Sequence, residues 1–511
     1  MTSFPFLSVL TLLPLVGAGV VAVLPQGRPQ LAKTVALVWS LAVLVLAALM
    51  YATFQVGGPR FQFRESYPWI PIWGTRFTLE ADGIALVMLA LIALLVPLVI
   101  LASWHDAGER SVPTYFALLL ALEFTMIGVF AAADIFLFYV FFEVMLVPMY
   151  FLIGSYGGAR RQYAAVKFFL YSLVGGLIML AALIGLWVVG RGQLGHATFD
   201  WHELTRLHMN TSTERWLFLG FFLAFAIKAP FFPFHTWLPD AGGAAPAGAA
   251  ALLVGVLDKV GTFGILRYCL PLFPNASKYF APLALALALI GVLYGALLAV
   301  GQNDLKRLVS YTSVAHFGFI GIGIFAFTTQ AGTGAVFYMV NHGLATGLLF
   351  LVVGMLVARR GSALVSDFGG AGKLVPLLAG VFLIAGLASL SLPGMSPFVS
   401  EFLVLLGTFT VNKTLAVVAV LGVILAAGYV LWMVQRATQG ALNPALEKID
   451  SMRRDISARE IVVVAPLIAL ILVLGFYPKP VLDVVNPAVQ ATFSQIGKAD
   501  PNPTVAQGGG K

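Results

Sequence analysis

The chain has 511 residues, of which 60% are apolar and 10% are charged. Soluble domains have about 45–50% apolar and about 25% charged residues, so the charges here are too few to cover soluble domains of this total length. The formal net charge of +8 does not indicate nucleic-acid binding, because the lysines and arginines lie mostly in short clusters between apolar runs. The composition therefore predicts a multi-pass membrane protein whose main partner is the lipid bilayer and which binds no nucleic acid.

Apolar runs long enough to cross a bilayer, about 20 residues each, recur along the chain. We expect an all-α fold with about fourteen transmembrane helices. They cover residues 4–24, 31–54, 81–104, 112–132, 134–154, 164–190, 215–236, 248–271, 280–301, 307–328, 332–358, 374–409, 414–436 and 459–477. No Lys or Arg precedes the first run, Phe6–Leu24, so we expect a retained helix there rather than a signal peptide.

Three segments between or after the runs have their own patterns. Residues 55–80 alternate short apolar and polar stretches, which predicts an extracytoplasmic hairpin. Residues 443–458 begin with Asn443-Pro444, an N-cap and a proline at the first helical position, and predict an amphipathic helix on the cytoplasmic surface. Residues 498–511 are rich in Pro and Gly, which is typical of a disordered tail.

The loop charges predict the orientation, because cytoplasmic loops carry an excess of Lys and Arg. With the N-terminus outside, the cytoplasmic loops hold sixteen of these residues and the opposite side, including the C-terminal tail, holds eleven. We therefore expect both termini on the extracytoplasmic side of a bacterial cytoplasmic membrane.

Several ionisable residues lie inside the apolar runs, where each costs about 2.5–3.5 kcal/mol. These are Glu123, Glu143, Lys228, Asp258, Lys259 and Glu401, together with His316 and His342. Glu123, Asp258 and the two histidines also fit a structural interpretation, as satisfied pairs between helices. For Glu123 and Asp258 we also expect no broken backbone nearby. The other four are harder to explain by packing alone, because a dry or lipid-facing site would favour their replacement.

Two of these residues lie beside predicted breaks in a helix. Lys228 is followed by Pro230 and Pro233, and Glu401 follows Leu392-Pro393-Gly394. Proline removes a backbone donor, and broken backbone at membrane depth is tolerated only when buried in protein or beside a watery cavity. About 165 residues separate the breaks, which allows five spans and so inverts the topology between two repeats.

The predicted organisation follows from these breaks. It comprises residues 1–111 with the first three helices and loop 55–80, a first five-helix repeat 112–271 broken near 228–236, a second repeat 280–436 broken near 391–401, a cytoplasmic segment 437–458, a last helix 459–477 and a tail 478–511.

Standard catalytic and metal-binding patterns are absent from the sequence. It has no G-x-S-x-G, H-E-x-x-H or P-loop motif. The single cysteine, Cys269, can form neither an internal disulfide nor a thiolate cluster for iron–sulfur. His316 and His342 lie on consecutive spans with no second pair, which disfavours haem. We therefore expect no metal and no cofactor in this chain.

Five stretches nevertheless resemble one family, the antiporter-like membrane subunits of respiratory complex I. They are Phe136–Pro148, Tyr163–Phe169, Phe234–Ala241, Gly301–Leu308 and Tyr311–Phe319. The resemblance runs from about residue 80 to 477. It is greatest to the M-type branch, the counterpart of mitochondrial subunit 4, because the second broken helix carries Glu401 where the sister subunits have lysine. The chain departs from the family pattern after Asp240-Ala241, where Gly242 replaces the usual histidine.

The resemblance implies a proton pump within a hetero-oligomeric NADH–quinone oxidoreductase, flanked by sister membrane subunits. That assembly would use NADH, FMN, iron–sulfur clusters and a quinone in other chains. Glu143 and Lys228 would form a switchable pair. Lys259, His316 and His342 would pass the proton towards Glu401, with Glu123, Lys167, His235 and Asp258 as modulators. Lys167 equally fits a lysine that reaches the cytoplasmic face.

Other functions remain open at this level. One is a subunit of a multi-chain sodium/proton antiporter with the same fold, and another is the pumping subunit of a membrane-bound hydrogenase. A structural membrane scaffold is disfavoured by the buried charges beside two broken helices.

Overall fold

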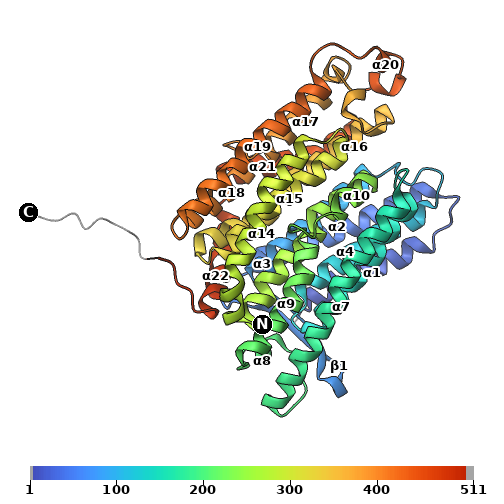
Figure 1. Cartoon of the computed structure of the whole chain (residues 1–511). Coiled ribbons are helices and arrows are strands. Elements are labelled where there is room, and N and C mark those ends of the chain that lie inside the picture. Colours follow the sequence, from blue (N-terminus) through green and yellow to red (C-terminus); the bar gives the residue numbers. More distant parts are fainter. Residues whose placement is uncertain (1–3, 502–511) are drawn as a thin grey trace, which may run out of the picture.

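The computed structural model describes residues 4–501, which fold almost entirely into helices (Figure 1). The α-helices are α1 Phe6–Ala22, α2 Pro29–Thr53, α3 Gly83–Ala102, α4 Val112–Ala131, α5 Ile135–Val144, α6 Leu146–Tyr156, α7 Arg161–Leu194, α8 Trp201–Leu204, α9 Thr211–Lys228, α10 Trp237–Ala244, α11 Ala247–Leu252, α12 Lys259–Gly264, α13 Leu270–Leu272, α14 Pro274–Val300, α15 Leu305–Phe325, α16 Thr329–Arg360, α17 Pro376–Ser389, α18 Ser396–Phe409, α19 Lys413–Thr438, α20 Pro444–Glu447, α21 Ala458–Phe476 and α22 Lys479–Gln495. The π-helical turns are η2 Leu253–Leu257 and η3 Ile265–Cys269, and the 3-10 turns are η1 Pro71–Trp73, η4 Val365–Asp367, η5 Ala371–Lys373 and η6 Asp450–Arg453. The prediction of an all-α, multi-pass membrane protein is confirmed.

Eleven helices in the described part of the chain are long and apolar enough to cross a membrane. The remaining three predicted spans fall on shorter or more charged helices. These are α1, the broken pair α17 and α18, and α9, which carries Glu214, Arg215 and Lys228 within 18 residues. The total of fourteen spans stays a prediction.

The segment predicted as a hairpin is one. Strands β1 (Gln62–Ile70) and β2 (Thr75–Ala81) pair antiparallel, with Tyr67 opposite Phe77. Gly74 closes the turn with a φ of 73°, which a residue without a Cβ adopts at little cost. Asp134, the N-cap of α5, accepts a hydrogen bond from the backbone N–H of Arg76 at 2.9 Å, so the hairpin is attached to the start of that helix.

Both predicted breaks are present. α9 ends at Lys228, and α10 begins after eight residues without regular structure that include Pro230 and Pro233. The indole of Trp237 donates to the carbonyl of Ile227 at 2.9 Å, which satisfies a backbone acceptor that the interrupted helix leaves free. The second break separates α17 from α18, with Gly394 at a φ of 93° between them.

Three expectations from the sequence are wrong in detail. Residues 443–458 form only α20 and η6, not one amphipathic helix on the surface. The reason is that their apolar side chains face the protein: Leu446 and Met452 are fully buried, and Asp455 accepts hydrogen bonds from the N-terminal backbone of α17. Nor is the backbone regular beside Asp258, because η2 ends immediately before it.

The third correction concerns the tail 478–511. It begins with a helix, α22, whose buried face includes Val485, Val489 and Phe493 and packs against α3 and α16. Arg60, from the loop before β1, donates to Thr492 on α22 at 2.8 Å. The disorder expected for 498–511 concerns mainly residues outside the described part of the chain.

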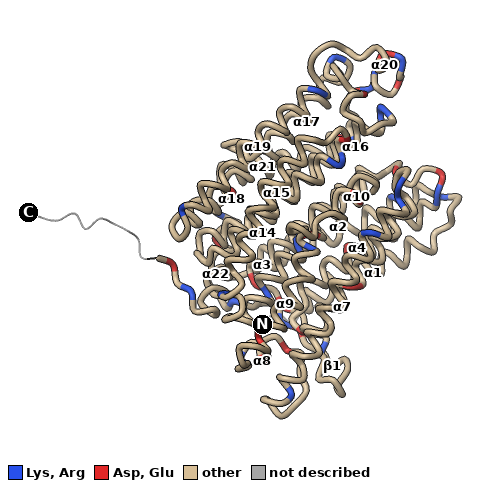
Figure 2. Tube along the Cα trace, viewed as in Figure 1, with Lys and Arg blue, Asp and Glu red and all other residues tan. Residues whose placement is uncertain are grey.

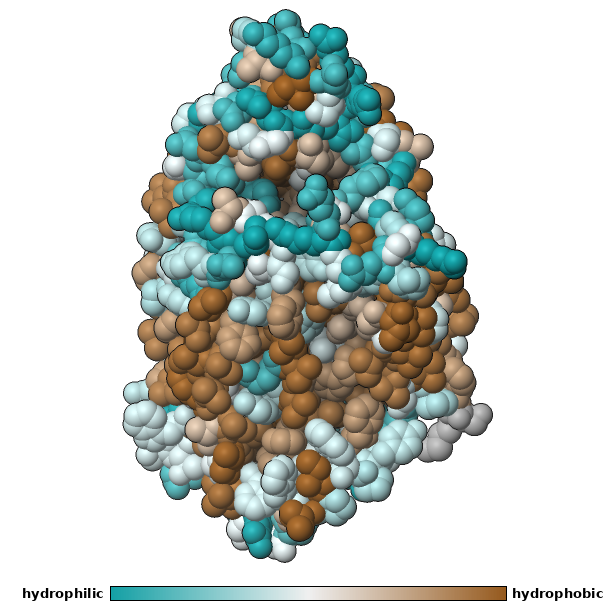
Figure 3. Space-filling model, turned by 90° about the vertical axis from the view of Figure 1, so that its right-hand side faces the viewer, coloured by the Kyte–Doolittle hydropathy of each residue, from teal (hydrophilic) through white to brown (hydrophobic). Residues whose placement is uncertain are grey.

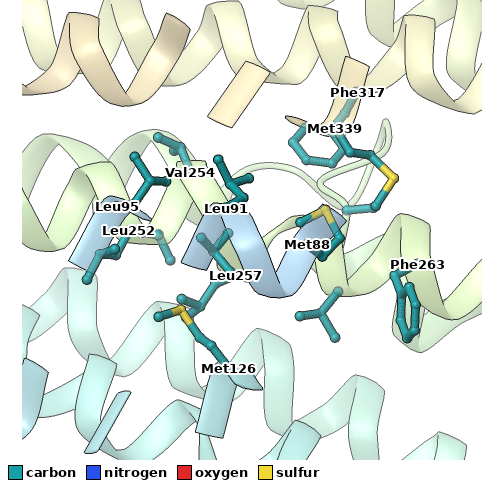
Figure 4. Close-up of a cluster of buried hydrophobic side chains, with 14 of the residues drawn as sticks. Met88, Leu91, Leu95, Met126, Leu252, Val254, Leu257, Phe263, Phe317 and Met339 are labelled. Atoms are coloured by element: carbon teal, nitrogen blue, oxygen red, sulfur yellow. The ribbon is translucent and has the colours of Figure 1, made fainter. Parts of the chain in front are cut away.

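The surface and the interior agree with a protein in a bilayer. On the face in Figure 3 a hydrophobic band lies below a hydrophilic cap, and Figure 2 shows Lys and Arg mostly at the ends of the long helices. Figure 4 shows a cluster of buried side chains that includes Leu257 from η2, Met88 from α3 and Met126 from α4. This packing surrounds the segment that carries Asp258 and Lys259.

Candidate functional site

Glu143 lies near the end of α5 and projects towards α7. A Cβ built on Gly176 of α7 would lie 1.5 Å from Glu143 Oε1, so the carboxyl occupies the space that a side chain at this position would need. Glu143 Oε1 is buried and has no hydrogen-bond partner among residues 4–501. The absence of a side chain at position 176 therefore positions this carboxyl.

Lys228 is the last residue of α9 and is fully buried. Its Nζ has no hydrogen-bond partner in the described part of the chain and lies 5.5 Å and 5.3 Å from the ring centroids of Phe142 and Phe168. Among the described residues no carboxylate lies within 4.0 Å of it. The structure therefore holds Lys228 against aromatic faces, near enough to Glu143 for electrostatic interaction but without an ion pair.

The centre of the site is Lys259, the first residue of α12. Its Nζ lies 3.1 Å from Asp258 Oδ1 and 2.6 Å from His342 Nδ1, and it also donates to the carbonyl of Val254. Val254 belongs to η2, and a π-helical turn inside an α-helix is a frequent feature of functional sites. All four residues are buried. Asp258 also interacts electrostatically with Lys228, so one carboxyl is coupled to both lysines.

From His342 the polar groups continue towards the second broken helix. The rings of His342 and His316 are 5.2 Å apart, and Tyr338, one turn before His342 on α16, is 5.7 Å from His316. Ser391, at the second break, lies beside both Tyr338 and Glu401. Glu401 on α18 is buried and borders an apolar cavity of about 320 Å³.

The structure adds residues that the sequence does not single out. Asn341 of α16 donates to Ser396 O at 2.9 Å and to Ser400 Oγ at 3.0 Å, which fixes α16 to the helix that carries Glu401. Tyr338 and Ser391 fill the gap between His316 and Glu401. These are neutral polar residues, and a search for charges in apolar runs passes over them. The spacing of Tyr338 and His342, four residues on one helix, was the available signal.

The polar residues described so far form a buried row, made up of Lys228, Asp258, Lys259, His342, His316, Tyr338 and Glu401. Three of the expected modulators lie away from this buried row. Both carboxyl oxygens of Glu123, on α4, are buried, and neither has a hydrogen-bond partner among the residues that the structure describes. His235 lies in the first break, with its ring stacked 6.0 Å from that of Phe232. Lys167 on α7 forms an ion pair of 2.7 Å with Asp240 on α10, so it does not simply reach out to water. The roles of all three stay predictions.

A metal site was not expected from the sequence. Across residues 4–501, no group of three or more His, Cys, Asp or Glu side chains is arranged to hold a metal ion.

Comparison with known proteins agrees with this arrangement. The family model described as NADH:quinone oxidoreductase/Mrp antiporter, TM, matches residues 132–426. NADH-quinone oxidoreductase subunit M of Mycobacterium tuberculosis is 49% identical, and the match covers 99% of this chain and 97% of that protein. A chain of respiratory complex I from Thermus thermophilus, solved with bound NADH, superposes with a TM-score of 0.86 at 31% identity, covering 96% of this chain and 100% of that one.

A chain of the Mrp complex from Dietzia sp. DQ12-45-1b superposes with a TM-score of 0.84, covering 96% of this chain and 98% of that one. Its identity is only 22%, so this likeness concerns the fold alone. The chain therefore belongs to the NADH:quinone oxidoreductase/Mrp antiporter family of membrane subunits and, within it, to the branch of NADH-quinone oxidoreductase subunit M.

Proposed function

We propose that this chain moves protons across the membrane as a subunit of NADH–quinone oxidoreductase, while NADH oxidation and quinone reduction take place in other chains. The observation that carries the proposal is that Lys259 is fully buried and forms hydrogen bonds with both Asp258 and His342. Ionisable groups inside a membrane are costly and mark ion or proton pathways. A packed apolar contact would stabilise a purely structural protein at least as well.

The first step of the proposed mechanism is a change in the separation of Glu143 and Lys228. At an effective dielectric of about 20, moving two unit charges from about 4 to about 8 Å apart weakens their attraction from roughly 4 to roughly 2 kcal/mol. That difference corresponds to a roughly thirtyfold change in the proton affinity of the lysine. Lys228 lies against Phe142 and Phe168, with no described carboxylate within ion-pair distance. This position corresponds to the separated state, in which the proton is released more easily.

The proton would then pass along the buried row. Asp258 interacts with both Lys228 and Lys259, and a proton on Lys259 can enter the short hydrogen bond to His342 Nδ1. Three buried polar atoms have no hydrogen-bond partner between residues 4 and 501. They are His342 Nε2, His316 Nδ1 and the Tyr338 hydroxyl oxygen. Buried polar atoms are normally hydrogen-bonded, so water would complete the path through His316 and Tyr338 to Glu401.

The same proposal assigns the cofactors and partners. NADH, FMN, iron–sulfur clusters and quinone would belong to other chains, and sister membrane subunits would flank this one. A tag on the C-terminal residues and purification from the native membrane test this. Flavin, iron–sulfur clusters and many subunits should co-purify with NADH dehydrogenase activity. Recovery with a few small membrane proteins and no redox centre would favour a sodium/proton antiporter instead.

The pathway itself is tested with Glu143→Ala and Lys228→Ala in the assembled complex. We expect proton uptake by inverted membrane vesicles to fall by at least about tenfold, because a positioned proton-transfer group contributes about 10²-fold or more. NADH oxidation should fall with it where the two are tightly coupled. The measurements are the initial rate of NADH oxidation and the quenching of a pH-sensitive dye.

Glu109→Gln and Lys448→Ala are the matched controls, because both side chains are exposed and outside the buried row. They should pump like the unmodified complex. A Glu143→Ala or Lys228→Ala complex that assembles and pumps normally would refute the pathway.

A further inference from the structure

Asp240, on the second half of the first broken helix, is held by two cations from two other helices. Its Oδ2 lies 2.7 Å from Lys167 Nζ on α7, and its Oδ1 lies 2.5 Å from Arg307 on α15. The exposed fractions of the three side chains are 15%, 20% and 27%. The cluster therefore lies at the edge of the protein, where water reaches it, and not in the buried row.

Each of the three helices that meet at Asp240 also supports part of the proposed pathway. α7 contains Gly176, against which Glu143 packs. α10 is the continuation of the broken helix that ends at Lys228, and α15 carries His316. The Asp240 carboxylate thus connects the three helices that support Glu143, Lys228 and His316.

The residues after Asp240 make this contact possible. A Cβ on Gly242 would lie 2.4 Å from Ser310 Oγ, and a Cβ on Gly243 would lie 2.9 Å from Arg307 Cγ. Contacts this short force a neighbour to move. The glycines therefore let α15 approach α10 closely enough for Arg307 to reach Asp240, at the place where the family pattern has a histidine.

We infer that Asp240 is a positioning residue that clamps α10 between α7 and α15 and so couples the two halves of the pathway. The inference rests on the proposed function. With the clamp in place, a movement of α7 or α15 is transmitted to the broken helix and to Lys228. Without it, the broken helix moves independently, and NADH oxidation continues with fewer protons moved per NADH.

The test uses Asp240→Asn in the whole complex, reconstituted in liposomes, with the number of protons moved per NADH oxidised as the readout. We expect this ratio to fall about fivefold, the size of effect that one or two partly exposed ion pairs can produce. NADH oxidation should continue, and Asp240→Glu, which keeps the charge, should restore the ratio. Asp450→Asn removes an exposed acid without an ion pair on another cytoplasmic segment and should change nothing.

Gly243→Ala provides a second route, because it displaces Arg307 without removing any charge. It should lower the number of protons moved per NADH oxidised, as Asp240→Asn does. If the Asp240→Asn complex fails to assemble, Gly243→Ala still tests the inference. An unchanged ratio in both variants overturns the inference, and so does a parallel loss of oxidation, pumping and assembly, which indicates a structural role only. Glu143→Ala in the same liposomes separates the two hypotheses: normal pumping there refutes the pathway, whatever Asp240 variants do.

Discussion

The buried charges in this protein are positioned by the residues around them, and one of these residues has no side chain. Glu143 fits because Gly176 has no side chain, and Lys228 rests on the faces of two phenylalanines rather than on a carboxylate. Lys259 is different, because its hydrogen bonds to Asp258, Val254 and His342 fix its position. Within residues 4–501, the ammonium group of the first lysine is thus held by no hydrogen bond, whereas that of the second has three partners.

Gly176→Ala tests the residue scale without removing any titratable group. The new methyl group would displace the Glu143 carboxyl, and a misplacement of about 1 Å can cost about a hundredfold in rate. We expect proton uptake to fall by about tenfold or more, close to the effect of Glu143→Ala. Gly192→Ala on the same helix is the control, because nothing lies within 4 Å of its Cβ. Equal pumping by the two alanine variants would show that the carboxyl does not need its present position.

At the scale of elements, the sequence predicts where the helices break better than it predicts how they pack. Pro230, Pro233 and Pro393 mark where helices cannot continue, and the structure has both interruptions there. The π-helical turn before Asp258 has no such marker, because it contains no proline and its one glycine, Gly255, is of a type that is common in transmembrane helices. α22 was missed because an amphipathic helix of moderate hydropathy is not long or apolar enough to be read as a span.

The same limit applies to the site. The charged members of the row stand out because charge is rare in apolar runs. Tyr338, Asn341 and Ser391 do not, since neutral polar residues are common on helix faces. Apolar periodicity also cannot tell a face that meets lipid from one that meets protein. This explains why residues 443–458 are predicted to form a surface helix, although Leu446 and Met452 are buried in the protein.

The hairpin is attached to the helical body by a buried ionic cluster. Glu80 on β2 accepts hydrogen bonds from Arg267 at 2.9 Å and from His202 at 2.9 and 3.0 Å. Burial acts to raise the pKa of Glu80, but the hydrogen bond from His202 and the charge of Arg267 outweigh it, so this pKa lies below its ordinary value. A lowered carboxyl pKa stabilises the attached state above the ordinary pKa of about 4.3, and the effect is lost as the pH falls below it.

We therefore expect Glu80→Gln to loosen the hairpin at neutral pH, where the unmodified hairpin stays attached. Breaking a buried pair costs about 3–5 kcal/mol, and the lower end applies because Asp82 still pairs with Arg267 at 3.2 Å. Hydrogen exchange of the β1 and β2 amides measures the change. Glu203→Gln, in an exposed pair with His196, is the control and should have little effect. Unchanged protection in Glu80→Gln would show that apolar packing alone holds the hairpin.

At the scale of the whole molecule, the two ends of the long helices differ in the short elements and in the charges that they carry. Figure 1 shows β1 and α8 towards one end and α20 towards the other. The ends of the helices near α20 carry more of the Lys and Arg residues in Figure 2. Because cytoplasmic segments retain such residues, the α20 end is expected to be cytoplasmic and the hairpin end extracytoplasmic. Under the proposed function, Asp240, Lys167 and Arg307 then lie towards the side from which protons would be taken up.

This orientation predicts the location of the C-terminus, which follows α22. Alkaline phosphatase, which is active only outside the cytoplasm, should be active when fused after Asp500, whereas green fluorescent protein there should stay dark. The same reporters inserted after Gly440, an exposed glycine between α19 and α20, should give the opposite result. The two positions control for each other, because each reporter must work at one of them. If fluorescence appeared at Asp500 and phosphatase activity at Gly440, the orientation would be reversed. Protons would then have to enter through the hairpin end, and the Asp240 clamp would lie on the release side.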